Sequence, residues 1–342
     1  MPVRIKWSRS ILLVACLGSA QASTLFVSSY NTSEVLTYDG GTGASVNNPF
    51  VGSGSGGLAQ PVGLVLAPNG NLLVASDGTS QVLEYNSSTG AFVSAFVSSG
   101  SGGLDTPTGL TYGPSGNLFV SSFNSNEVLE YDGSTGAPVS TFVSSGSGGL
   151  NSPTGLTFGP NGNLFVASDI NSEILEYDGS TGAFVTTFVS SGSGGLDEPP
   201  DLTFGPNGNL FVTSDGNSEV LEYDGNTGAF VATFVGAGSG GLSAPNGLTF
   251  GPNGNLFVSS NNEVLEYDGS TGAFVTTFVT SGSGGLDGSS FLLFAPEPGT
   301  WLLVACGLAI LIGARRLRRR LIAHTKTTGK RREKPRFSSL FA

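Results

Sequence analysis

The 342-residue sequence has no basic side chain over most of its length. All 14 Lys and Arg residues lie within residues 1–9 or 315–336, and the single histidine is His324. The stretch 23–314 nevertheless holds 24 of the 25 Asp and Glu residues. It can form no ion pair between its own side chains, so its carboxylates must be hydrated, hydrogen-bonded or matched by external cations.

The same stretch also lacks the residues of several catalytic mechanisms. The two cysteines, Cys16 and Cys306, lie in terminal apolar runs, so the region between them has no disulfide and no thiolate. Without histidine it has no Ser–His or Cys–His pair, and without lysine no Schiff base. Glycine-rich runs such as 144–149 also lack the lysine of a phosphate-binding loop, and they recur along the chain. We interpret them as linkers between structural units.

The N-terminus has the pattern of a secretory signal peptide. A basic segment (residues 4–9) precedes an apolar run (11–17), and Ala20 and Ala22 form a small-x-small cleavage site. We therefore expect residues 1–22 to be a signal helix that is cleaved after Ala22. An alternative remains, because residues 13–16 resemble a bacterial lipobox that would be lipidated at its cysteine.

The C-terminus combines a proline-rich motif, an apolar run and a cluster of arginines. Pro296, Glu297 and Pro298 precede the run 301–314, which is followed by five arginines within residues 315–320. A run of 14 residues is shorter than the roughly 17–25 of a comfortable membrane-spanning helix. We expect a short transmembrane helix whose arginines stay on the cytoplasmic side.

These three parts resemble the PEP-CTERM sorting signal of bacterial surface proteins. The resemblance covers 296–320 and implies an exosortase-type processing enzyme as partner, with exopolysaccharide or surface proteins as later partners. Residues 321–342 continue as a basic tail, a departure from the family pattern; we expect this tail to be cytoplasmic and not to bind nucleic acid. A plain membrane anchor is the alternative.

Between these ends the sequence is a repeat of 46 residues. The segment 155–166 returns almost unchanged at 201–212 and 247–258, and earlier copies begin at Gly63 and Gly109. One repeat predicts four strands, at 155–158, 164–168, 173–177 and 183–189, separated by Gly-containing turns. Four short antiparallel strands in 40–50 residues are typical of a β-propeller blade.

The ends of the repeat region complete one another. Residues before Gly63 supply strands at 25–29 and 34–38 and a degenerate strand near 46–51, whereas a first strand is missing there. The segment 291–294 provides it from the other end of the region. The sequence therefore predicts an all-β fold, a six-bladed propeller of four-stranded blades over residues 23–295, closed between its two ends.

The repeat resembles the NHL family and its six-bladed relatives. The resemblance lies in Pro-Thr-Gly-Leu-Thr-Phe-Gly-Pro-Asn-Gly-Asn-Leu-Phe-Val followed by Asn-Ser-Glu-Val-Leu-Glu-Tyr-Asp, and it covers residues 24–295. The usual arginine of the third strand is absent, with glutamates nearby instead. The Gly-His and Trp-Asp pairs of WD40 repeats do not occur.

Departures from the repeat mark a candidate metal site. One position after the second strand holds an acid in three blades, and Asp201 replaces the glycine that opens the first strand elsewhere. Converging carboxylates suit a hard cation, so Ca²⁺ is the candidate cofactor. The alternative is that these acids cap turns and face solvent. The candidate ligands are Asp77, Asp169, Asp201 and Asp215.

Two functional hypotheses follow. The first is a non-catalytic binding scaffold at the bacterial cell surface or in the extracellular matrix, based on the terminal signals and the missing nucleophile–base pairs. The second is a metal-dependent lactonase or hydrolase, because related six-bladed lactonases hold a metal with acids near the channel mouth. No catalytic motif of that group is recognisable.

Overall fold

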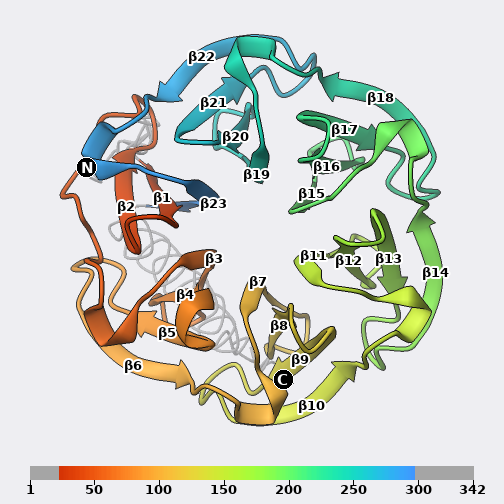
Figure 1. Cartoon of the computed structure of the whole chain (residues 1–342), viewed down its shortest axis with the longest axis horizontal. Helices are drawn as coiled ribbons and strands as arrows, with labels where there is room; N and C mark the ends of the chain where they lie inside the picture. Colours follow the sequence, from red (N-terminus) through yellow and green to blue (C-terminus); the bar gives the residue numbers. More distant parts are fainter. Residues whose placement is uncertain (1–22, 297–342) are drawn as a thin grey trace, which may run out of the picture. The chain divides into compact units, whose positions relative to one another are not determined.

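The computed structural model describes residues 23–296, and they form six antiparallel sheets arranged as blades around a central axis (Figure 1). No helix within this range is long and apolar enough to cross a membrane. The signal peptide with Ala20 and Ala22, the membrane helix, the basic tail, Glu297 and Pro298 lie outside the described residues. Pro296 is the last residue of the last strand.

Five blades have four strands each, in sequence order from the axis to the rim. The second blade has β3 (Pro61–Leu66), β4 (Leu72–Ser76), β5 (Gln81–Tyr85) and β6 (Phe92–Val97); the third has β7 (Pro107–Tyr112), β8 (Leu118–Ser122), β9 (Glu127–Tyr131) and β10 (Pro138–Val143); the fourth has β11 (Pro153–Phe158), β12 (Leu164–Ser168), β13 (Glu173–Tyr177) and β14 (Phe184–Val189); the fifth has β15 (Leu202–Phe204), β16 (Leu210–Ser214), β17 (Glu219–Tyr223) and β18 (Phe230–Val235); and the sixth has β19 (Pro245–Phe250), β20 (Leu256–Ser260), β21 (Glu263–Tyr267) and β22 (Phe274–Val279).

The first blade confirms the predicted closure. Its sheet has the order β2–β1–β23, so β23 (Ser289–Pro296) from the end of the repeat region pairs with β1 (Ser23–Ser29), and β2 (Glu34–Asp39) lies outside them. The expected fourth strand is not regular. Residues 44–51 form only two isolated bridges with β2, and the side-chain amide of Asn48 takes the place of a backbone partner for Thr37. The edge of β2 is covered in this way.

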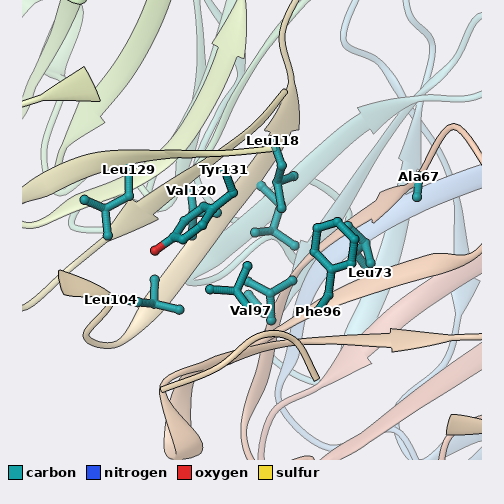
Figure 2. Packing of buried hydrophobic residues seen from close by; sticks show 12 residues of the cluster. Ala67, Leu73, Phe96, Val97, Leu104, Leu118, Val120, Leu129 and Tyr131 are labelled. Atoms are coloured by element: carbon teal, nitrogen blue, oxygen red, sulfur yellow. The ribbon is translucent and has the colours of Figure 1, made fainter. Parts of the chain in front are cut away.

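The hydrophobic core lies between blades rather than within one continuous centre. Nearly every residue of the second and third strands is buried, because neighbouring blades cover both of their faces. Figure 2 shows one such seam, where Phe96 and Val97 of the second blade pack against Leu118, Leu129 and Tyr131 of the third. Equivalent clusters fill the other five seams.

The Ser/Gly linkers form ordered 3₁₀ turns. In one of them, Ser147–Gly149, Gly146 and Gly148 take φ values of 72° and 63°, which favour glycine. The hydroxyl of buried Tyr177 donates a hydrogen bond to the Ser147 carbonyl at 2.8 Å. The same bond recurs in every blade, so each third-strand tyrosine fixes the connection that enters its own blade.

Carboxylates are held by neutral donors in place of ion pairs. In the fourth blade, Glu176 on β13 accepts hydrogen bonds from the side-chain amides of Asn161 and Asn163 at 2.9 and 2.8 Å. The Asn-Gly-Asn turn therefore orients two amides as well as reversing the chain. In the next turn, Asp178 accepts from the hydroxyl and backbone N–H of Thr181, and these bonds keep the pKa of its exposed carboxyl low.

Candidate functional site: the mouth of the central channel

The first strands of all blades approach one another at the centre (Figure 1). Their packing explains the repeated glycine: a Cβ atom on Gly155 would lie 2.7 Å from Cα of Asp201 in the next blade. Gly155 also donates a backbone hydrogen bond to the Pro200 carbonyl at 2.9 Å. Because the inner strands are this close, only the residue before each glycine and the loops at one end are free to shape the channel mouth.

A pocket of about 430 Å³ occupies this mouth. Every blade contributes the residue before its glycine, or the equivalent residue before Asp201 or in β23, and these six positions hold five different residue types. This inner ring consists of Val62, Thr108, Thr154, Pro200, Asn246 and Ser290. The remaining lining comes from β23 and from loops of the second, sixth and first blades: Ser289, Phe291, Asp77, Tyr30, Asn31, Asn261, Asn262 and Gly288.

Hydroxyl groups tie the inner strands together across the blade seams. In the third and fourth blades the donor is on the first strand: Thr108 and Thr154 donate to the carbonyls of Pro153 and Pro199 at 3.0 and 2.8 Å. The side-chain hydroxyl of Ser121, on the second strand of the third blade, is buried and has no hydrogen-bond partner among the described residues.

In the first, fifth and sixth blades the donor is instead on the second strand. Ser28 donates to the Val62 carbonyl at 2.6 Å, Thr213 to Asn246 at 2.8 Å, and Ser259 to Ser290. At the seam from the second to the third blade, the first-strand position is Val62 and the second-strand position is Ala75. Neither side chain can supply a hydroxyl.

The predicted metal ligands occupy three different environments. Asp77 lines the pocket, and its carboxylate accepts a hydrogen bond from the Tyr30 hydroxyl at 2.9 Å. Burial raises the pKa of Asp77, and burial together with this carboxylate raises the pKa of Tyr30 to about 12. Both groups are therefore arranged as a donor–acceptor pair that faces the channel mouth.

Asp201 is buried beneath the mouth rather than open to it. Its two carboxylate oxygens accept backbone N–H groups of Leu202 and, in the next blade, Leu248, at 2.9 and 3.2 Å. Burial raises its pKa to about 7 against the opposing effect of these hydrogen bonds. Asp201 thus links two blades. Pro200, which has no N–H group, stands where the fourth blade has Thr154, and the first strand of this blade begins only at Leu202.

Asp169 and Asp215 lie outside the pocket lining, where they meet other acids. Burial, followed by the charges of Glu198, Asp215 and Asp197, raises the pKa of Asp169 to about 6. Burial and the charge of Glu198 raise the pKa of Asp215. Within residues 23–296, no three His, Cys, Asp or Glu side chains are placed so that they could hold a metal ion. The structure does not bring the four predicted ligands together at one centre.

Sequence reasoning missed the amide and hydroxyl groups of the mouth. Four asparagines lie in the lining, and Asn261 and Asn262 form a connection between β20 and β21 that is two residues shorter than its equivalents. Asn261 takes a φ of 50°, which asparagine tolerates better than most residues. The available signal was variation: the residue before the repeat glycine takes five identities over six blades, while the strand after it hardly changes.

No protein-family model and no curated protein sequence matches the chain. Among solved structures, it is similar to a chain of a nidogen/laminin complex, with 15% identity, a TM-score of 0.61 and coverage of 80% of this chain and 98% of that one. A protein of unknown function from Bacteroides caccae is similar with 15% identity and a TM-score of 0.60, over 81% of this chain and 100% of that one. A gluconolactonase from Xanthomonas campestris is similar with 16% identity and a TM-score of 0.56, over 70% of this chain and 83% of that one. At these identities the comparisons show the propeller fold alone.

Proposed function

We propose that this chain is an exported, non-catalytic binding protein that holds its ligand at the mouth of the propeller channel. One observation carries the proposal: a single position of a near-identical repeat presents five different residue types over six blades to one pocket of about 430 Å³. Pockets of this size are typical of small-molecule sites. The repeat builds the scaffold, and the variable position gives the pocket its chemistry.

The terminal segments support export. The signal peptide pattern of residues 1–22 and the sorting pattern of 296–320 together favour a propeller outside the cytoplasm, at the cell surface or in the matrix. Because of the PEP-CTERM resemblance, the proposal includes processing by an exosortase. It also includes exopolysaccharide or surface proteins as partners. Intact-mass measurement of the protein recovered from the producing cells tests it, since processing removes everything after the Pro-Glu-Pro region.

Binding is tested with the full-length chain in a thermal-shift screen of neutral, cationic and anionic small molecules. We expect a subset to raise the melting temperature, and we expect Asn246→Trp, which fills the mouth, to abolish that shift. Asn124→Trp, in the β8–β9 loop outside the pocket lining, is the matched control and should leave it unchanged. Hits that survive in Asn246→Trp would place the site elsewhere and contradict the proposal.

A metal-dependent lactonase or hydrolase is the second candidate. The observation that favours it is Asp169, whose pKa of about 6 suits proton transfer near neutral pH and which lies among further acids. A panel of sugar and homoserine lactones, assayed with Ca²⁺ and with NaCl of matched ionic strength, separates the two candidates. Ca²⁺-dependent turnover that is lost in Asp169→Asn would establish the enzyme and refute the non-catalytic proposal.

A further inference from the structure

We propose that the channel mouth recognises a neutral, hydroxyl-rich ligand, namely an uncharged saccharide. This inference rests on the proposed binding function and specifies the ligand class. It follows from which hydrogen-bonding groups the fold leaves unused at the mouth, and from the charge of the surrounding residues.

Asn246 and Ser290 have free side chains because other residues make the bonds that join their blades. At the equivalent positions of the third and fourth blades, the hydroxyls of Thr108 and Thr154 bind the next blade. At the seams around the sixth blade, Thr213 and Ser259 make these bonds to the backbone carbonyls of Asn246 and Ser290. No described residue hydrogen-bonds the side chains of Asn246 and Ser290, although both line the pocket.

The loops add further amides to the lining. The short connection of the sixth blade brings both Asn261 and Asn262 into the lining, and Asn31 joins them from the first blade. No described residue hydrogen-bonds the side chain of Asn261. Asn262 accepts the Gly288 N–H at 2.7 Å and Asn31 donates to Asp287 at 3.0 Å, so each keeps only part of its amide for a ligand. An amide both donates and accepts hydrogen bonds, as does a hydroxyl. A cluster of amides and hydroxyls therefore matches a ligand whose own groups donate and accept at neighbouring positions, which is the property of a sugar ring. The rings of Tyr30 and Phe291 provide apolar surface beside it.

Charge opposes anionic ligands, and the existing hydrogen bond of the one carboxylate in the lining limits recognition of cations. Residues 23–296 contain 23 acidic and no basic side chains, so an anion would enter a repulsive field without a counter-charge. The only carboxylate in the pocket lining, Asp77, already accepts the Tyr30 hydroxyl and has a raised pKa, which weakens it as a partner for an organic cation. A neutral polyol remains, and Asp77 can accept one of its hydroxyl protons.

The test uses one sugar ring in three charge states. Binding of N-acetylglucosamine (neutral), glucosamine (cationic) and glucuronate (anionic) to the full-length chain is measured by titration calorimetry, together with disaccharides of glucose and galactose. We expect a neutral sugar to bind and glucuronate not to bind. The double variant Asn246→Ala/Asn261→Ala should weaken binding about 10-fold, because two neutral hydrogen bonds contribute roughly 0.5–1.5 kcal/mol each.

Asn124→Ala is the matched control, since it removes an amide from a loop on the same face outside the lining. Circular dichroism melting of all variants establishes that each is folded. Preference for glucosamine over every neutral sugar would overturn the inference about the ligand class. If Asn246→Trp then abolished glucosamine binding, the proposed binding site would still stand. Binding of a neutral sugar that the double variant does not weaken would overturn the site. If no sugar binds and the wider screen gives no hit, both the inference and the proposed function fail.

Discussion

Replacing Glu84 tests whether carboxylate–amide clusters stabilise a propeller that has no ion pairs. Glu84 is 6% exposed and accepts hydrogen bonds from the amides of Asn69 and Asn71 and the hydroxyl of Ser94 at 2.9, 2.8 and 2.9 Å. Glu84→Leu removes the acceptor and keeps a side chain of similar length. Glu84→Gln keeps one acceptor oxygen, and its amide can donate to Ser94, so it removes mainly the charge.

The magnitude follows from the exposure of the partners. Hydrogen bonds to a charged group contribute roughly 1.5–3 kcal/mol each when both partners are buried. The side chain of Asn69 is exposed and that of Asn71 half-buried, so both amides are hydrated once the carboxylate is gone. We therefore expect Glu84→Leu to lower the free energy of unfolding by about 2–3 kcal/mol in total and Glu84→Gln by about 1 kcal/mol.

Urea denaturation at pH 7, with thermal melting alongside, measures the two variants. A loss of about 2–3 kcal/mol corresponds to a melting temperature lower by roughly 4–10 °C for a domain of this size. Burial raises the pKa of Glu84, but its three hydrogen bonds outweigh burial and lower it below the ordinary value of 4.5. Its stabilisation is therefore present above that value and lost as pH falls further, so wild type and Glu84→Leu should converge in acid.

The control is Glu127→Leu, at the start of a third strand, where no described residue donates a hydrogen bond to the carboxylate; its effect should stay within about 0.5 kcal/mol. Equal losses for Glu84→Leu and Glu84→Gln, or a loss no larger than that of the control, would refute the role assigned to these clusters.

Three further predictions concern the inner strands. The pKa of about 7 at Asp201 means that the folded state retains a proton which the unfolded chain releases near pH 4, so wild-type stability should fall as pH rises between these values. Asp201→Asn should reduce that slope in urea titrations, most clearly between pH 6 and 7, since Asp169 with its pKa of about 6 contributes a slope of the same sign at lower pH. Val62→Thr supplies the hydroxyl missing at its seam and should raise stability by roughly 0.5–1 kcal/mol, whereas Val62→Ala, the size control, should not. Deletion of 289–295 exposes β1 and should abolish cooperative melting; an unchanged transition would contradict closure by β23.

The strands could be predicted because the repeat presents each of them several times. Segments 164–168 and 173–177 were predicted with the bounds that the structure has. The predicted first strand, 155–158, begins two residues later than β11, since Pro153 pairs with Ser168 across an irregularity that the turn pattern does not reveal. Such pairing depends on the neighbouring strand and leaves no periodic signal in the sequence.

The first blade was less predictable because it is the one copy assembled from both ends. Its fourth segment was predicted as a degenerate strand, but Asn48 and the bridges of Val35 and Tyr38 satisfy β2 without a regular ladder. A side chain that replaces a backbone partner has no sequence pattern of its own. The closure could still be predicted, because it required only that one strand be missing at the start and one be left over at the end.

Only one of the four acids predicted as metal ligands belongs to the pocket lining. Carboxylates are predicted as ligands because they suit metal ions, and Asp77 lines the pocket. Asp201, the most conspicuous departure from the repeat, instead satisfies two backbone N–H groups. Sequence alone does not distinguish a buried acid that joins two blades from an acid that faces a ligand, since either would appear as an acid at the position of the repeat glycine.

The complete absence of basic residues connects the stability of this propeller to its binding chemistry. Carboxylates such as Glu176 and Asp178 are matched by amides and hydroxyls of the repeat itself, so they require no cation. Further acids stand in loops near the channel mouth, Asp169 among them, where burial and the charges of neighbouring acids raise its pKa. A propeller held together by neutral donors can keep a strongly negative field around the mouth. Such a field admits neutral polar molecules to the amides of the pocket and opposes the entry of anions.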